Sequence, residues 1–254
     1  MNISEFVPEN AQRDRIWLII GGRNTGKSVL LKDLLYKTQR NTDLCMGMTG
    51  TISTADMFRT CMPPDFVYQD GYDYDKADQY LTSCTDLAKK GKVRHTTICL
   101  DDVVFDPKVF KNKTQQALHL NGRHFKTSVF ETTQYAMVVP TVIRANIDYV
   151  IALRDCVTAS KRRLFENFYG IFPSYAEFDK VFTEVTKNYG ALVLDRTQTS
   201  GNITDLITHY RASPSLPGFS LGKPIFFKLG NMYNNSKKKR EQSGIARKNI
   251  KRIA

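Results

Sequence analysis

The sequence lacks the features of a secreted or membrane-spanning chain. It has no run of about 18 apolar residues, the length that a membrane helix needs. Its first residues, MNISEFVPENAQRDR, carry charges where a secretory signal requires a continuous apolar stretch. We therefore expect a soluble, intracellular protein with no stable membrane insertion.

The cysteines also lack a pattern. There are five, an odd number, and no two form a CxxC pair. Neither a disulfide framework nor a zinc site is favoured by such spacing, so we expect reduced and mostly buried thiols. The cysteines are Cys45, Cys61, Cys84, Cys99 and Cys156.

Acidic residues are in short supply relative to basic ones. The chain of 254 residues has a net charge of +12, which favours a polyanionic partner such as nucleic acid or an anionic membrane surface. Eight Lys or Arg lie between Lys237 and Arg252 against the single acid Glu241. We expect residues 231–254 to form a basic, flexible tail, and such an arm can hold phosphates without reading sequence.

Apolar runs alternate with helical patterns along the rest of the chain. Strands are predicted at residues 16–20, 44–48, 96–100, 127–131, 149–153 and 191–194, and helices at 27–37, 53–59, 74–89, 107–120, 141–145, 159–169 and 175–188. This alternation predicts an α/β fold with parallel strands and helices on both faces. We expect one domain over residues 1–230, with residues 1–13 as an arm.

The stretch IWLIIGGRNTGKSVLLKDLLYKT contains G-x-x-x-x-G-K-[ST] between an apolar strand and a leucine-rich helix. Gly21 and Gly26 allow the loop to wrap its N–H groups around phosphates, Lys27 would reach the β- and γ-phosphates, and the Ser28 hydroxyl would ligate Mg²⁺. The helix that follows points its positive end at the phosphates. The predicted nucleotide-binding residues are Gly21, Gly22, Arg23, Asn24, Thr25, Gly26, Lys27, Ser28 and Val29.

A second acidic motif, HTTICLDDV, follows about 70 residues downstream of the loop. Its β-compatible residues end in Asp101 and Asp102, as in a Walker B strand. Asp101 would hold Mg²⁺ through water and Asp102 would polarise the attacking water. An acid directly after the Walker B Asp favours hydrolysis over kinase chemistry, and the alternative is an ordinary strand that ends in an acidic turn.

Three further polar residues are candidates for catalysis. Gln134 ends the apolar run TSVFETTQ at the expected carboxyl edge of the sheet, where it would sense the γ-phosphate or orient water. Arg123 and Arg144 are candidates for an arginine finger that acts in trans on a neighbouring subunit. Each arginine could equally pair with a surface carboxylate.

The motifs together resemble a known family over roughly residues 17–210. The segments IIGGRNTGKSVLLKDLL, TICLDD, NGRHFKTSVFETTQY, VPTVIRANIDYVIAL and YGALVLDRT are similar to the genome-packaging ATPases of nucleocytoplasmic large DNA viruses, the poxvirus-type branch of the FtsK–HerA superfamily. The resemblance implies a RecA-like core with extra C-terminal strands, Mg²⁺-dependent ATP hydrolysis, and Gln134 at the sensor position. It also implies a homo-oligomeric ring, a pentamer or hexamer, which moves double-stranded viral DNA into a capsid.

That resemblance further implies capsid or portal-vertex partners and a location at the viral assembly site in the host cytoplasm or in the virion. Three other readings stay open. A DNA-pumping ATPase or helicase of non-packaging role would share every motif. A nucleotide-dependent switch or structural virion component would bind ATP without turnover. A small-molecule kinase would need a basic lid, of which the sequence has no clear signature.

Overall fold

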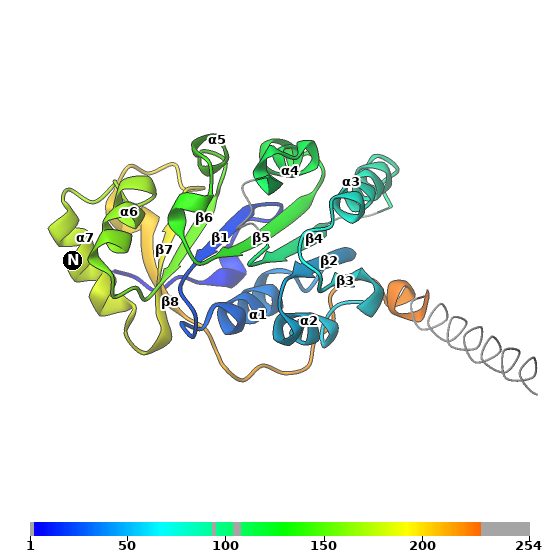
Figure 1. Cartoon of the computed structure of the whole chain (residues 1–254), viewed down its shortest axis with the longest axis horizontal. Coiled ribbons are helices and arrows are strands. Elements are labelled where there is room, and N and C mark those ends of the chain that lie inside the picture. The colour runs from blue at the N-terminus through cyan, green and yellow to red at the C-terminus, as the bar shows by residue number, and fades with distance from the viewer. Residues whose placement is uncertain (1–2, 93–94, 104–107, 230–254) are drawn as a thin grey trace, which may run out of the picture.

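One eight-stranded sheet organises the chain (Figure 1). The computed structural model describes residues 3–92, 95–103 and 108–229. The strands lie in the order β3 (Val67–Tyr68), β2 (Leu44–Thr49), β4 (Thr96–Asp101), β5 (Thr127–Thr133), β1 (Ile16–Ile20), β6 (Tyr149–Leu153), β7 (Gly190–Asp195) and β8 (Ile207–Arg211). The predicted mostly parallel α/β sheet with extra C-terminal strands is confirmed.

The helices cover both faces of this sheet. On one face lie α1 (Lys27–Thr38) and α2 (Ile52–Arg59); on the other lie α3 (Tyr74–Lys89), α4 (Lys113–Asn121), α5 (Thr141–Arg144), α6 (Thr158–Asn167) and α7 (Tyr175–Val185). A short α8 (Ile203–Leu206) precedes β8. Because both faces are covered, the central strands are buried along their whole length, and this accounts for their nearly unbroken apolar sequence.

Strand direction changes at one side of the sheet. The strands from β3 to β6 pair in parallel, whereas β6–β7 and β7–β8 pair antiparallel. The alternation of strands and helices accounts for the parallel strands, and the antiparallel pairs are confined to the two strands at the C-terminal side of the sheet. The connection after β6 contains two helices, α6 and α7, and a helix pair returns the chain to the edge that it left. Ala191 therefore pairs with Leu153, so that β7 begins where β6 ends.

The largest difference in an element boundary lies at the start of α4. The helix predicted from residue 107 begins at Lys113, since the Asn112 side chain accepts from the backbone N–H groups of Thr114 and Gln115. Short 3₁₀ turns at Pro8–Asn10, Pro64–Phe66 and Ala136–Val138 had no sequence prediction, whereas those at Val109–Lys111 and Lys187–Tyr189 occupy the start and the end of predicted helices. The predicted tail, residues 231–254, lies outside the described residues, and the single-domain assignment stays a prediction.

Aromatic stacking fills the core beneath α1. The Trp17 indole lies between the rings of Phe130 and Tyr149, with centroids at 5.3 and 4.0 Å. Phe6, from the segment that precedes β1, packs against Trp17, and its backbone N–H donates to His209 of β8. The segment expected as an arm is thus in contact with the sheet from Ser4 onward, since the His209 N–H donates to the Ser4 carbonyl.

A buried polar cluster lies on the opposite face. His119 of α4 contacts the Glu131 carboxylate of β5 at 3.2 Å, and neither side chain is exposed. Burial lowers the pKa of His119, but the charge and hydrogen bond of Glu131 and the carbonyl of Gln115 outweigh it and raise that pKa overall. The pair is structural, since Glu131 faces away from α1.

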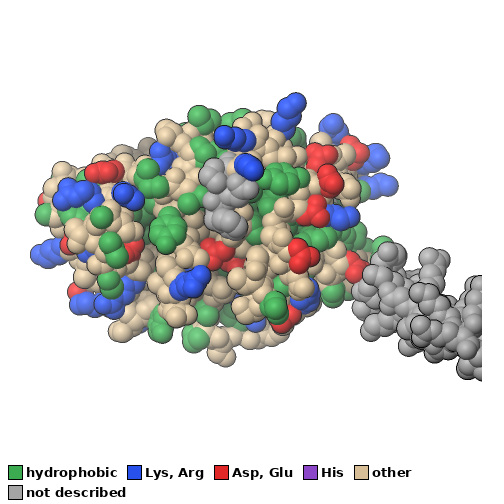
Figure 2. All heavy atoms as spheres, in the orientation of Figure 1, with side chains coloured by type: hydrophobic (Ala, Val, Ile, Leu, Met, Phe, Trp, Pro, Cys, Tyr) green, Lys and Arg blue, Asp and Glu red, His purple; other side chains and the backbone are tan. Residues whose placement is uncertain are grey.

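Charge is unevenly spread over the surface. In Figure 2, acidic side chains gather mainly at the end of the molecule that carries α3, where basic side chains lie among them, and further basic side chains lie over α6 and α7. Three consecutive basic residues, at positions 161–163, belong to α6. Among the described residues, no helix has the length and apolar character that a membrane span requires.

Candidate nucleotide-binding site

The glycine-rich loop joins β1 to α1 in a conformation that needs both glycines of the G-x-x-x-x-G-K-[ST] pattern, Gly21 and Gly26. A Cβ at Gly21 would lie 2.7 Å from Thr25 Oγ1 and 2.9 Å from Leu153 Cβ, so the chain passes too close for a side chain. Gly26 has φ of 97°, which favours glycine. Lys27 then begins α1 and is buried, with its ammonium donating to the carbonyls of Gly21 at 2.8 Å and Gly22 at 3.3 Å.

The two aspartates lie at the carboxyl end of β4, close to this loop. Asp101 is buried, and it stands between Thr49 of β2 and Thr132 of β5 in the sheet register. The hydroxyl of Thr132 donates to Asp101 Oδ1 at 2.7 Å, and that of Thr49 donates to Oδ2 at 3.3 Å. Two hydroxyl donors on neighbouring strands thus fix the orientation of this carboxylate.

Asp102 points into the site from a strained backbone. Its φ is 52°, in the left-handed region that few non-glycine residues adopt, and its N–H donates to Thr132 Oγ1 at 3.1 Å. The left-handed backbone at Asp102 points the two acids in different directions. Asp101 stays in the sheet, whereas the Asp102 carboxylate lies 3.6 Å from the Lys27 ammonium. Gln134 Nε2 donates to the same carboxylate at 3.2 Å.

Lys27, Asp101, Asp102 and Gln134 therefore gather at one edge of the sheet, as the sequence predicts. They come from three places in the chain and meet because the parallel strands β1, β4 and β5 end at the same edge. An ammonium, two carboxylates and an amide next to a glycine-rich loop have the chemistry to bind a polyphosphate and its counter-ion.

The residues present also fit Mg²⁺. Ser28 places a hydroxyl in the first turn of α1, and Asp101 presents a carboxylate already held by two donors. Oxygen donors of this kind, few in number, suit Mg²⁺, which keeps several waters and takes other ligands from substrate phosphates.

Arg123 lies away from this edge. Its guanidinium forms an ion pair with the Asp148 carboxylate, which is 3% exposed, at the edge where the parallel strands begin. Burial raises the pKa of Asp148, whereas the Ile16 N–H and the Arg123 and Arg15 charges lower it. The five residues of β1 separate the two edges by roughly 16 Å, so Arg123 does not reach the loop of its own chain.

Arg144 is also held at a distance. It ends α5, just before β6 begins, and its guanidinium donates to Asn167 Oδ1 and, at 2.6 Å, to Thr141 Oγ1. Neither arginine is brought to the site within one chain.

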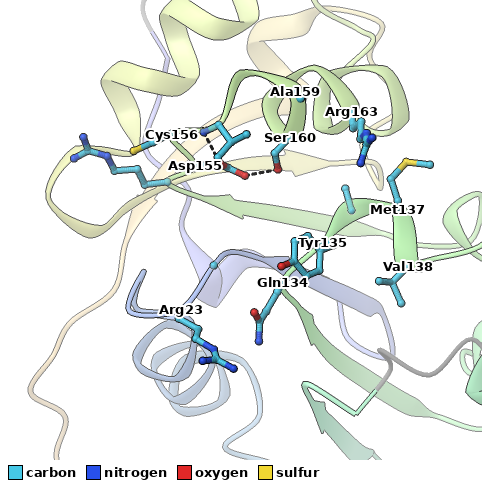
Figure 3. Close-up of a pocket in the computed structure, with 14 residues that line it drawn as sticks. Arg23, Gln134, Tyr135, Met137, Val138, Asp155, Cys156, Ala159, Ser160 and Arg163 are labelled. Atoms are coloured by element: carbon cyan, nitrogen blue, oxygen red, sulfur yellow. Dashed lines mark hydrogen bonds between the residues drawn. The ribbon is translucent and has the colours of Figure 1, made fainter.

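A hollow of about 920 Å³ opens beside the loop, and its lining combines the predicted site residues Arg23 and Gln134 with residues that sequence reasoning did not select (Figure 3). Arg23 lies on its loop side, Gln134 at the end of β5, and Ser160 and Arg163 project from α6. Arg154, directly after β6, also lines it. The position of Arg154 at a strand end was the sequence signal that could have selected it. Arg163, Thr49 and Thr132 carried no such signal, because only the sheet register and the packing of α6 place them here.

The chain is similar to proteins of large DNA viruses. Protein 088R of Invertebrate iridescent virus 3 is 31% identical over 211 residues, which cover 83% of this chain and 80% of that protein. The chain belongs to the 088R family. Another member, protein 075L of Invertebrate iridescent virus 6, is 30% identical over 71% of this chain and 70% of its own length. No protein-family model matches the chain.

The fold of this 088R-family chain has a match among solved structures. The genome packaging NTPase B204 from Sulfolobus turreted icosahedral virus 2, in complex with ATP-gammaS, superposes with a TM-score of 0.57 and 16% identity over 81% of this chain and all of that chain. At this identity the likeness concerns the fold. The expected resemblance to viral genome-packaging ATPases is confirmed by this fold and by relatives from large DNA viruses.

Proposed function

We propose that this 088R-family protein is a Mg²⁺-dependent ATPase that moves double-stranded viral DNA into a capsid. The observation that carries the proposal is the meeting of Lys27, Asp101, Asp102 and Gln134 beside the glycine-rich loop. A kinase or a passive nucleotide binder has no need of a second acid aimed at the phosphate-binding lysine, whereas hydrolysis needs a group that activates water.

Each of these residues has a distinct part. The loop N–H groups and Lys27 would bind the phosphates, with the Lys27 ammonium exchanging its carbonyl acceptors for phosphate oxygens. The Asp102 carboxylate would accept a hydrogen bond from the attacking water and direct it at the γ-phosphate. Gln134 would hold Asp102 in place through the bond at 3.2 Å and respond to the loss of the γ-phosphate.

Ser28 and Asp101 would hold Mg²⁺, the former directly and the latter through water. When bound, Mg²⁺ neutralises phosphate charge. The two threonine hydroxyls hold the Asp101 carboxylate in a fixed orientation for this task without placing another charge in the site.

DNA as the substrate is supported by charge and by relationship. A net charge of +12 suits a protein that grips phosphates of any sequence, and the basic segment 231–254 adds to that grip. B204, which shares the fold, is a genome packaging NTPase. We further propose a homo-oligomeric ring with capsid or portal-vertex partners, at the viral assembly site in the host cytoplasm or in the virion.

In such a ring, Arg123 or Arg144 would act on the nucleotide of a neighbouring subunit. Both lie at a sheet edge remote from their own loop, so only a second copy can bring either one to the γ-phosphate. Mixing Arg123→Ala or Arg144→Ala subunits with Lys27→Ala subunits should then restore part of the lost activity, whereas additive loss would contradict the trans role.

The proposal is tested by the ATPase rate with and without long duplex DNA. We expect Lys27→Ala and Asp102→Asn to lose at least 100-fold, roughly the value of a group that stabilises the transition state. Lys37→Ala, at the other end of α1, is the matched control and should keep wild-type activity.

Two results would contradict the function. If the wild type hydrolyses ATP no faster than Lys27→Ala, the chain is not an ATPase, and a nucleotide switch or structural role becomes preferable. If hydrolysis is real but indifferent to DNA at low and moderate salt, translocation of DNA is wrong.

A further inference from the structure

The turn between α7 and β7 has an unusual backbone. Asn188 and Tyr189 both have positive φ, of 50° and 61°. Asn adopts this region often, but for a bulky residue such as Tyr it is a genuine outlier. Burial does not compensate for the strain, since the Tyr189 side chain is 70% exposed. A strained, exposed aromatic side chain is one whose position is set by the surrounding structure.

The residues on either side fix this turn. A Cβ at Gly190 would lie 2.0 Å from the carbonyl oxygen of Val185 and 3.1 Å from that of Lys187, so the chain closes tightly on the end of α7. Before the turn, the buried Thr186 hydroxyl donates to the Phe182 carbonyl at 2.7 Å. After it, β7 enters the sheet against β6. The chain on both sides of Tyr189 is therefore anchored.

The anchored ring lies against the phosphate-binding loop. A Cβ built on Gly26 would be 3.4 Å from Tyr189 Cδ1 and 3.9 Å from its Cβ. Gly26 directly precedes Lys27, so the ring stands beside the start of α1. The antiparallel course of β7 brings it there, since β7 begins at the edge where the loop lies.

The residues on the other side of the site, Asp102 and Gln134, indicate the direction in which a bound nucleotide would extend. Asp102 and Gln134 come from β4 and β5, which lie on one side of β1, whereas β7 lies on the other. In phosphoryl transfer the attacking and leaving oxygens are roughly in line through the γ-phosphate. With water held near Asp102, the remainder of the nucleotide extends away from β4 and toward β7, where Tyr189 stands.

We propose that Tyr189 is the platform on which the base of the bound nucleoside triphosphate stacks. The assignment rests on the proposed nucleotide site and adds the residue that binds the base. Stacking on an aromatic face tolerates different bases, because every base has a π-face, so Tyr189 would contribute affinity more than a choice among bases.

Binding measurements with ATP and inorganic tripolyphosphate, each with Mg²⁺, separate the base from the phosphates. Tyr189→Gly removes the ring and relieves the strained φ, and it should melt at no lower temperature than the wild type. We expect Tyr189→Gly to weaken ATP roughly tenfold, a moderate value for one stacked base. Tyr189→Phe should stay within about twofold of the wild type, because it keeps the ring. Tripolyphosphate should bind equally to all three proteins.

The outcomes are distinct. If the wild type binds neither ligand, the nucleotide site itself is wrong. If the wild type binds both and Tyr189→Gly binds ATP as well as the wild type, the site stands and the role of Tyr189 is overturned. Equal weakening of ATP and tripolyphosphate in Tyr189→Gly would also overturn it, since the ring would then support the loop and not the base.

Discussion

Replacing Thr132 by Val tests how the structure holds its two acids apart. The Thr132 hydroxyl donates to the buried Asp101 carboxylate at 2.7 Å and accepts from the Asp102 N–H at 3.1 Å. A hydrogen bond to a charged group contributes about 1.5–3 kcal/mol, and Val keeps the shape but offers no donor. The Asp102 side chain is 24% exposed, so water can replace part of the second bond. We expect Thr132→Val to lower the free energy of unfolding by about 2–3 kcal/mol.

Thr127→Val, on the same strand, is the matched control. Thr127 is also fully buried, but its hydroxyl bonds only to neutral groups, the Thr96 hydroxyl at 2.8 Å and the Phe125 carbonyl at 3.1 Å. Its loss should cost about 1 kcal/mol. Urea unfolding of both variants measures the difference. If Thr132→Val costs no more than Thr127→Val, the hydroxyl does not support a charged Asp101, and the reasoning about this carboxylate fails.

Three further predictions concern stability and reactivity. The carboxylate partner of His119 raises its pKa in the folded protein, so the stabilisation from the charged imidazole is complete below about pH 6.5 and is lost as pH rises through the folded pKa. The free energy of unfolding of the wild type, measured with urea, should therefore fall relative to that of His119→Gln as pH rises through that range. A difference between the two proteins that does not change with pH would contradict the pairing. Gly190→Ala should cost at least about 2 kcal/mol by overpacking, whereas Gly201→Ala, with open space around it, should change the unfolding free energy by less than about 0.5 kcal/mol. Of the five thiols only Cys156 is exposed, so a thiol reagent should modify one cysteine in the native protein and all five after unfolding; burial raises the pKa of Cys61 to about 12 and of Cys84 to about 11.

The parts of the fold that sequence patterns predicted well are the long, strongly apolar elements. The limits of β1, β6 and α3 agree with the sequence prediction to the residue, since burial of a whole strand or of one helix face leaves a pattern in every turn. The short β3 and β8 had no predicted range. Val67–Tyr68 forms a strand only because β2 lies beside it. Ile207–Arg211 forms a strand only because β7 lies beside it.

The candidate site likewise contains residues that the sequence could predict and residues that only the structure could place. Lys27, Asp101, Asp102 and Gln134 could be selected from sequence, because local motifs mark them and parallel strands bring their ends to one edge. Arg123 and Arg144 could be selected as basic residues but not placed. Only the structure shows that a buried carboxylate holds the first and that Asn167 and Thr141 hold the second.

By itself the sequence determined that the chain is an α/β protein with a glycine-rich loop between a strand and a helix and with paired acids at a strand end, because periodicity and spacing are local properties. Tertiary structure alone decided that β7 runs antiparallel, that Thr49 and Thr132 flank Asp101, and that Tyr189 lies against Gly26. Those contacts join residues tens to more than a hundred positions apart. The course of β7 and the place of Tyr189 depend on how α6 and α7 return the chain to the edge of the sheet, and the threonine contacts depend on the register of β2, β4 and β5; no local pattern records either.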